Sequence, residues 1–258
     1  MKRALSLILA LAICLAFAGC KADPSPYEAF TKAMQLNSEL TALESEAMLE
    51  SSVSYGSGNM SFKTESRSKQ IKHSEEDLEI SMDMSVSVLG MSVSMQMYYR
   101  NNFIYLDAMG MKYKSELDDA EFNEQFAREP IYFSEEDIVE QSIEKTVSGY
   151  TASFLIKGEA LKEYAIALLE ANDNYIDANA DYTLSDVQYI LNVASNGEFQ
   201  SSELNIPMSV AMGSEQGEVT LKLTETYLNT NSDVEITPPE NLDDYTLTDD
   251  GSDFDSLL

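Results

Sequence analysis

Residues that could carry out catalysis are scarce in this chain of 258 residues. Its one histidine, His73, lies in the polar run 69–77, which indicates a solvated turn. Because a Ser-His-Asp triad and a histidine-ligated zinc ion both need a histidine held against its partners, we expect neither. The sequence also lacks a Walker loop, a Gly-x-Ser-x-Gly elbow and a dinucleotide-binding glycine motif. It therefore predicts a protein that is not an enzyme.

Two acidic motifs match known sites only in part. The pair Glu135-Glu136 could serve a glycosidase, but it lies in a charge-rich helical stretch, and the chain has no tryptophan to stack on a sugar. The segment Asp177-x-Asn179-x-Asp181 begins like a calcium loop. It then has Tyr182 in place of the turning glycine and Gln188 in place of the closing glutamate. We expect weak cation condensation on the acidic surface, no bound metal and no cofactor.

The first twenty residues have the pattern of an export signal. Lys2 and Arg3 precede an apolar run over residues 4–18, and Gly19-Cys20 follows. A run of 15 residues is shorter than the roughly 20 that a membrane-spanning helix needs. The stretch from Phe17 to Cys20 is similar to the bacterial lipobox, whose cysteine is acylated and becomes the N-terminus, although leucine is usual where Phe17 stands.

This resemblance implies that Cys20 is the lipidation site. Residues 1–19 would be the signal peptide and 20–26 a lipidated tether, so that the protein is extracytoplasmic and anchored to the cell membrane. Cys14 leaves with the signal, and Cys20 carries the acyl chains. The remaining domain then has no disulfide and no thiol nucleophile.

Acidic residues dominate the charge of the chain. It carries 16 basic and 45 acidic residues, a net charge of −29, and removal of Lys2 and Arg3 with the signal brings this to −31. Nucleic acid is excluded as a partner, because affinity for phosphate backbones comes from clustered Lys and Arg. Adsorption to an anionic membrane is opposed for the same reason, whereas covalent acyl chains would hold even an acidic protein there.

The spacing of apolar residues predicts a helix followed by a series of strands. Ser25-Pro26-Tyr27-Glu28 has the features of a capping box, and the helix should run to about Asn37. From Leu43 the apolar residues alternate with polar ones, which is typical of half-buried strands. Such strands are predicted over 43–55, from 60, and over 78–88, 91–99, 103–108 and 111–115.

The second half of the chain mixes helices with further strands. Helices are predicted over 118–127, from Ser134, and over 159–171. Strands are predicted over 150–156, 183–193, 199–206, 207–212 and 219–228. About ten strands joined mostly by tight turns indicate an α+β fold built on an antiparallel meander. Residues 239–258 carry seven acids and no base, which is typical of a disordered tail.

Two turns fix the register of three central strands. Leu89-Gly90 suits a turn with positive φ at its third residue, and Asn101-Asn102 tolerates left-handed φ. A slip of one residue would oppose apolar and serine faces. The resulting pairs are Val88 with Met91, Val86 with Val93, Met84 with Met95, Met82 with Met97, Tyr99 with Ile104, Met97 with Leu106 and Met95 with Ala108.

This register places an apolar, methionine-rich surface on one side of the three strands. Seven of the thirteen methionines of the chain lie between Met82 and Met111. The surface could be ordinary core covered by helices, a groove for an acyl chain or another apolar ligand, or a Cu(I) site built from Met-x-Met pairs. The candidate ligand-binding residues are Met82, Met84, Val86, Val93, Met95, Met97, Tyr99, Ile104 and Leu106.

The order of these features resembles the LolA-like lipoprotein superfamily, which includes LolA, LolB and the LppX/LprG lipoproteins. The similarity lies in the lipidated cysteine, the helix, the long meander and the final strand that ends at Ile236-Thr237-Pro238-Pro239. Segments 97–107 (MYYRNNFIYLD) and 158–164 (GEALKEY) are similar to uncharacterised Gram-positive lipoproteins of that fold. The resemblance covers residues 27–238. It implies a strongly curved sheet, an incomplete barrel, with helices on its concave face over an apolar cavity.

Two functions follow from these observations. The first is a lipoprotein that binds an apolar or lipid-like ligand in the methionine-rich cavity, as a carrier or chaperone for lipid or lipoprotein. The second is a non-catalytic interaction or scaffold protein of the cell surface, with a filled core and a protein partner in the envelope. The family resemblance supplies no catalytic residues for either function.

Overall fold

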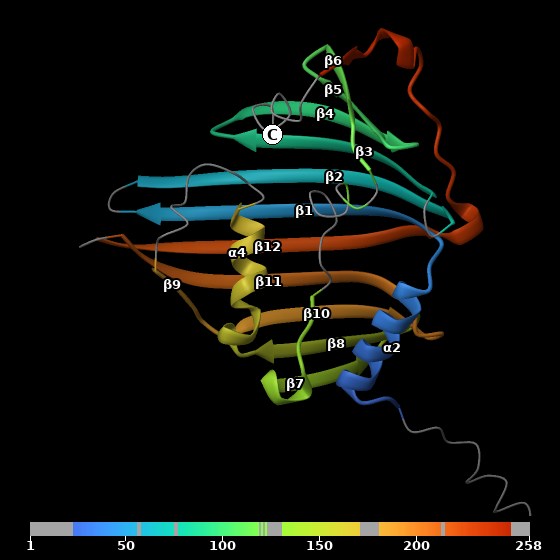
Figure 1. The fold of residues 1–258 in the computed structure, drawn as a ribbon. Helices are drawn as coiled ribbons and strands as arrows, with labels where there is room; N and C mark the ends of the chain where they lie inside the picture. Colours follow the sequence, from blue (N-terminus) through green and yellow to red (C-terminus); the bar gives the residue numbers. More distant parts are fainter. Residues whose placement is uncertain are drawn as a thin grey trace, which may run out of the picture.

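The computed structural model describes residues 23–55, 58–74, 77–118, 120, 122, 131–170, 181–212 and 215–248 (Figure 1). Its strands form one thirteen-stranded sheet in the order β13-β6-β5-β4-β3-β2-β1-β12-β11-β10-β8-β7, with β9 paired to β11. Apart from the parallel pair β13–β6, the pairings are antiparallel. The curved, unclosed sheet and its helices make the fold α+β, as predicted, although it has more than the ten strands expected.

The strands of the N-terminal half follow one another as hairpins. They are β1 (Ala42–Tyr55), β2 (Gly58–Ser74), β3 (Asp77–Val88), β4 (Met91–Arg100), β5 (Phe103–Ala108) and β6 (Met111–Glu116). The second half contributes β7 (Ile138–Lys145), β8 (Gly149–Ile156), β9 (Asp181–Leu184), β10 (Val187–Ala194), β11 (Phe199–Met212), β12 (Glu215–Thr230) and β13 (Thr246–Leu247). Because β12 pairs with β1, the two halves join in the middle of the sheet.

The predicted register of the central strands is confirmed. All four β3–β4 pairs and all three β4–β5 pairs occur as expected. The turns use more left-handed backbone than predicted, because Leu89 itself has φ 51° beside Gly90 at 83°. Two successive positive φ values are typical of a type I′ turn, whose twist matches that of the strands. Asn101 and Asn102 form the same kind of turn at 53° and 62°.

Two strand predictions in the second half are wrong. The strand predicted over 183–193 is two strands, β9 and β10, separated by Ser185 and Asp186. The strands predicted over 199–206 and 207–212 are the single strand β11, with Pro207 inside it. Proline fits there because its position falls between the segments of β11 that pair with β10 and with β9, so no ladder bond needs its missing N–H. Its carbonyl accepts a hydrogen bond from the Ser185 N–H at 3.1 Å.

The helix predicted from Ser134 is also wrong. Ser134 and Asp137 do form a capping box, but the helix ends after the 3-10 turn η1 (Glu135–Asp137). The chain then continues as the edge strand β7, paired with β8. Here pairing with a neighbouring strand outweighs the local helix-start signal. Of the helix predicted over 118–127, positions 119, 121 and 123–127 lie outside the described residues.

Within the described residues, two helices pack on one face of the sheet, which we call the helix face (Figure 1). The first is α2 (Pro26–Ser38), where Ser25 forms the predicted capping box with Glu28. The second is α4 (Lys162–Glu170), preceded by the 3-10 turn η2 (Gly158–Leu161). Neither of these described helices has the length and apolar character needed to cross a membrane. The opposite side of the sheet is the outer face.

Part of the segment expected to be a disordered tail packs on the sheet. After the 3-10 turn η4 (Leu242–Asp244), β13 pairs with the edge strand β6. The buried ring of Tyr245 meets that of Tyr105 edge-on at 5.3 Å, and Lys112 lies 5.2 Å from the Tyr245 ring centre. Aromatic burial and strand pairing thus offset the acidic composition up to Thr248. Positions 249–258 lie outside the described residues.

Candidate functional site

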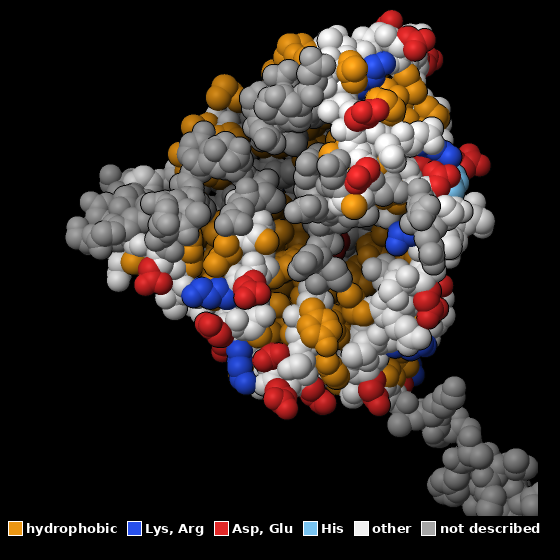
Figure 2. Space-filling view, viewed as in Figure 1, with side chains coloured by type: hydrophobic (Ala, Val, Ile, Leu, Met, Phe, Trp, Pro, Cys, Tyr) orange, Lys and Arg blue, Asp and Glu red, His pale blue; other side chains and the backbone are white. Residues whose placement is uncertain are grey.

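The nine candidate ligand-binding residues all lie on the helix face. Met84 faces Met95 across β3 and β4, and the same register carries this face onto β5. Figure 2, drawn from this side, shows apolar side chains gathered in the middle of the face and acidic ones along its lower margin. The buried residues Leu78, Ile80, Met95, Met97, Tyr99, Ile104, Leu106, Ala108 and Phe122 form what we call the methionine cluster, with Met82, Met84, Tyr113 and Leu117 packed against it.

Burial divides the nine residues into two groups. Met95, Met97, Tyr99, Ile104 and Leu106 are buried, and the Tyr99 ring stacks on Phe122 at 4.1 Å. The other four are more accessible, because Met82, Met84 and Val86 are half-buried and Val93 is exposed. The structure therefore brings all nine residues onto one surface and leaves part of that surface open to contact.

A second apolar cluster, the aromatic core, lies under α2 and α4. Phe30 of α2 stacks on Phe133 at 4.4 Å, and both lie close to Phe154 and Tyr189 of the sheet. Buried residues of α4 and of β8, β10, β11 and β12 complete this cluster. Its central rings are at most 3% exposed, so the aromatic core is filled by its own side chains.

Small side chains separate the two clusters. On β1 and β2, Ser45 pairs with Ser68 and Ala47 pairs with Ser66, and all four are half-buried. The Ser45 and Ser68 hydroxyls lie 3.0 Å apart and satisfy each other. We call these four residues the small-residue strip. They provide a low floor between the large side chains on either side.

Larger side chains stand on both sides of the strip. On the β3 side, Met84 pairs with Ser66 and Met82 with Ser68. On the β12 side, Glu225 pairs with Ala47 and Tyr227 with Ser45. Burial, with the Glu225 charge, raises the pKa of the Tyr227 hydroxyl to about 12, so this phenol is neutral at physiological pH. The strip is thus apolar on one side and polar on the other.

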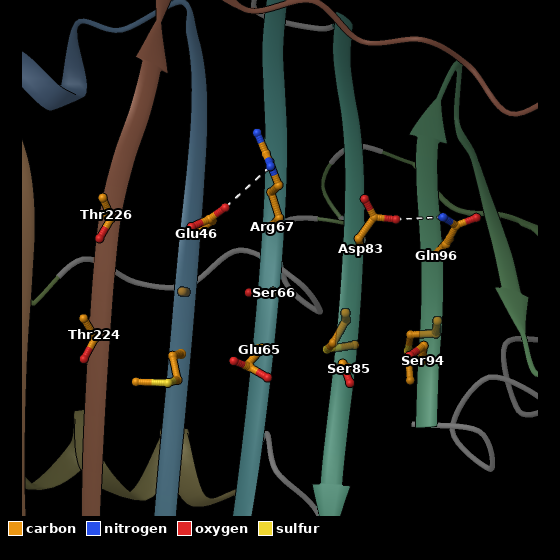
Figure 3. Close-up of a pocket in the computed structure, with 14 residues that line it drawn as sticks. Glu46, Glu65, Ser66, Arg67, Asp83, Ser85, Ser94, Gln96, Thr224 and Thr226 are labelled. Carbon is orange, nitrogen blue, oxygen red and sulfur yellow. Dashed lines mark hydrogen bonds and ion pairs between the residues drawn. The ribbon is translucent and has the colours of Figure 1, made fainter. Parts of the chain in front are cut away.

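The outer face of the same strands carries a different kind of hollow, of about 620 Å³. Figure 3 shows polar side chains of β12, β1, β2, β3 and β4 directed toward it. Arg67 lies 3.6 Å from Glu46, and the Gln96 amide donates to Asp83 at 2.8 Å. Ser85 and Ser94 also line it, as members of the serine face that alternates with the apolar one along β3 and β4. The outer-face residues around it are Glu46, Met48, Glu65, Arg67, Asp83, Ser85, Ser94, Gln96, Thr224 and Thr226. Ala47, Ser66, Met84 and Met95 also border it, but they alternate with these residues along the strands and belong to the helix face.

The sequence did not reveal a buried carboxylate beside this hollow. Glu44 is 3% exposed, accepts hydrogen bonds from Arg67 Nε at 3.0 Å and Nη2 at 2.7 Å, and also accepts one from Asn229. The Asn229 and Arg67 hydrogen bonds hold the pKa of Glu44 below its ordinary value. Glu44 therefore links β1 to both neighbouring strands. Its partners are 23 and 185 positions away, so no local pattern indicated them.

His73 has partners that its sequence context did not indicate. It lies near the end of β2 rather than in a turn, and its Nε2 is 2.8 Å from the buried carboxylate of Glu79. Arg100 also binds Glu79, and the Tyr98 hydroxyl donates to it at 2.9 Å. Burial and the Glu79 charge raise the pKa of Tyr98. These contacts satisfy the buried Glu79 carboxylate on the outer face.

Two sequence predictions concern residues for which the structure has little or nothing to add. Cys20 and the export signal lie outside the described residues, as does the calcium-like segment up to position 180. Within the described ranges, no three His, Cys, Asp or Glu side chains converge as they would around a metal ion. The methionine cluster and the small-residue strip together form the candidate ligand site.

Comparison with solved structures found chains that are similar to this one at low sequence identity. The chain is similar to LprF from Mycobacterium bovis, with 9% identity and a TM-score of 0.44 over 85% of this chain and 99% of that one. It is also similar to the ywiB protein from Bacillus subtilis, with 8% identity and a TM-score of 0.27 over 76% and 99%. No protein-family model and no curated protein matches the chain.

Proposed function

We propose that this protein is a membrane-anchored binding protein for an apolar or lipid-like ligand. The proposal rests on one observation: the small-residue strip, which forms the floor of the site, lies directly beside a row of methionines, which forms its apolar wall. Ser66 and Ser68 are small and half-buried, and Met84 and Met82 stand directly beside them, also half-buried. A close-packed core would place large side chains on both sides of this junction, as the aromatic core does.

Methionine suits such a wall. Its unbranched thioether side chain adapts to ligands of variable shape. The polar side of the strip, formed by Glu225 and Tyr227, would meet the polar end of an amphiphile while its chain lies against the methionines. The proposed ligand is therefore a molecule with an acyl chain and a polar head. No catalytic step is part of this function.

The proposed anchor is an acylated Cys20. It rests on Lys2, Arg3, the apolar run and Gly19-Cys20. Two or three acyl chains at about 0.8 kcal/mol for each buried methylene would hold the acidic domain on a membrane. Mass spectrometry of the N-terminal peptide tests it: a lipidated Cys20 as first residue is expected, and an unmodified cysteine or one still joined to Gly19 contradicts it.

Binding of a fluorescent fatty acid tests the ligand site. The chain from Lys21 onward contains every described helix and strand, so both clusters are complete in it. We expect this chain to bind the probe and Ser66→Phe, which raises the floor, to weaken binding at least about tenfold. The matched control is Ser85→Phe, because Ser85 lies on the outer face of the adjacent strand.

Folding is checked separately, since a larger side chain can destabilise a packed site by about 1–3 kcal/mol. Circular dichroism and thermal melting of both variants serve this purpose, and Ser68→Val provides a milder change at the same floor. Probe binding that survives in all the folded floor variants would contradict the site. Absence of probe binding by the parent chain would contradict the function.

A second candidate function is capture of a basic protein partner in the envelope. The hollow on the outer face favours it, because Glu46, Glu65 and Asp83 line it together with one basic residue, Arg67. Arg67 is already engaged by Glu44, so the surface remains acidic. Partner binding that falls with salt, is lost in Asp83→Lys and is unaffected by Ser66→Phe would favour this function over ligand binding.

A further inference from the structure

The apolar helix face continues out to the tips of two neighbouring hairpins. Along β4 the exposed fraction rises from 6% at Met95 to 39% at Val93 and 70% at Met91. At the same end of the sheet, Met111 of β6 is 40% exposed. Leu89 and Met109, in the two turns themselves, are 69% and 67% exposed. A continuous apolar surface thus connects the methionine cluster with solvent.

Backbone conformation makes the two tips unusual. Leu89 and Met109 have φ values of 51° and 52°, a region that glycine, asparagine and aspartate adopt more readily than apolar residues. The hairpin at the opposite end of β4 and β5 uses Asn101-Asn102 for the same backbone. Exposed apolar side chains therefore stand where polar residues would fold at least as well, which indicates that the tips are used for binding.

Charge sets this end of the molecule apart as well. Residues 84–95 include no charged side chain, although the chain as a whole has a net charge of −29. The turn from Ala108 to Met111 is likewise uncharged. A protein partner that recognises the acidic surface would not be attracted here. A surface with apolar groups beneath a neutral polar layer would bind this end of the molecule, because burying the exposed apolar side chains is favourable and removes no charged group from water.

We infer that the two hairpin tips dock on an electrically neutral lipid surface, so that the apolar surface leading to the ligand site meets that lipid surface. This inference rests on the proposed function for the identity of the ligand. In Figure 1 the β3–β4 turn lies at the upper left and the β5–β6 turn near the top, whereas the start of α2 lies at the lower right. An anchor near Pro26 and docking at Leu89 and Met109 would therefore use opposite ends of the molecule, so the chain from Lys21 onward isolates the tips.

Tryptophan fluorescence reports docking directly, because the chain has no tryptophan of its own. We expect Met91→Trp to shift its emission to shorter wavelength on vesicles of phosphatidylcholine. The control is Val147→Trp, which lies in the exposed β7–β8 connection and should not shift. An unchanged emission at position 91, or equal shifts at both positions, would overturn the inference.

Vesicle flotation measures the contribution of the turns. The double variant Leu89→Asn, Met109→Asn places asparagine where it is favoured, so the fold should remain intact. We expect it to lose phosphatidylcholine binding by about tenfold or more, whereas Val147→Asn binds like the parent. Vesicles of phosphatidylglycerol should bind the parent more weakly at low salt, because the protein is acidic. Equal binding by the double variant and the parent would overturn the inference.

Fatty-acid binding without vesicles separates this inference from the proposed function. The double variant should bind the probe as the parent does, because Met82, Met84 and the strip are unchanged. Vesicle docking without probe binding would leave the docking surface standing and refute the ligand site. Probe binding without vesicle docking would leave the ligand site standing and refute the docking surface.

Discussion

The two apolar clusters of the helix face are built from different side chains and are covered to different extents. In the aromatic core, rigid rings from α2, the segment before η1 and the sheet stack on one another and leave little surface exposed. In the methionine cluster, the side chains nearest the small-residue strip are flexible and half-buried. This difference shows that one sheet can carry a tightly packed region beside a more accessible region of flexible side chains.

The comparison predicts the largest loss of stability in the aromatic core. Phe133 is 2% exposed and contacts the rings of Phe30, Phe154 and Tyr189. Phe133→Ala should lower the free energy of unfolding by about 3–5 kcal/mol, because it leaves a cavity that rigid neighbours cannot fill. Urea unfolding measures this. Tyr132→Ala is the adjacent control, since Tyr132 is 82% exposed, and a similar loss there would contradict the packing.

Within the methionine cluster, the cost should depend on distance from the strip. Met95 is 6% exposed, and Met95→Ala should destabilise the protein by about 2–5 kcal/mol. Met84→Ala should cost only about 1 kcal/mol, because its half-buried side chain has fewer packing neighbours to lose. Urea unfolding of the two variants gives the comparison directly. Equal costs would mean that this region is a filled core like the other.

The junction between the clusters should depend on pH through Glu44. Its hydrogen bonds with Arg67 and Asn229 favour the charged carboxylate and lower its pKa from the ordinary 4.5. The resulting stability is present above pH 4.5 and is lost as the pH falls through the folded-state pKa. Glu44→Gln should therefore lower the free energy of unfolding at pH 7 by about 0.5–1.5 kcal/mol, since solvent around the half-exposed Arg67 screens the interaction. Urea unfolding at several pH values should show the difference from the parent shrinking in acid; a constant difference would contradict the assignment.

The smallest effects are expected on the outer face opposite the methionines. Ser94 is exposed and Ser85 is half-buried in the polar hollow. Ser85→Ala and Ser94→Ala should each change the free energy of unfolding by at most about 0.5 kcal/mol. Thermal or urea unfolding provides the check. Losses as large as that of Met95→Ala would show that the two faces have been assigned the wrong way round.

Local patterns were sufficient for the central strands because a slip by one residue has a high cost there. In β3 and β4 such a slip would oppose methionines to serines, so the alternation defines the register. The capping box of Ser25 and Glu28 similarly predicts the start of α2. By contrast, a proline normally interrupts a strand. Pro207 is accommodated in β11 because it faces the gap between β9 and β10, where no backbone N–H is needed for pairing.

The candidate site was only partly predictable, because local patterns define only the part of it that lies on adjacent strands. Met82, Met84, Met95 and Met97 lie on β3 and β4, which are joined by a tight turn, so their positions could be predicted from the sequence. The small-residue strip depends on the β1–β2 register and on β12, which pairs with β1 from the far end of the chain. Serines and alanine give no signal of their own. Their role appears only when Met84 and Ser66 are found side by side.

The central claim is that the junction beside the methionine cluster holds an apolar ligand. Native mass spectrometry of the gently purified chain from Lys21 onward, compared with denaturing spectra, tests it most directly. The parent and Ser85→Phe should retain a noncovalent amphiphile that denaturation releases, whereas Ser66→Phe should lose it while remaining folded. A parent chain that carries no amphiphile and takes up no added fatty acid, or a ligand equally retained by folded Ser66→Phe, would contradict the claim.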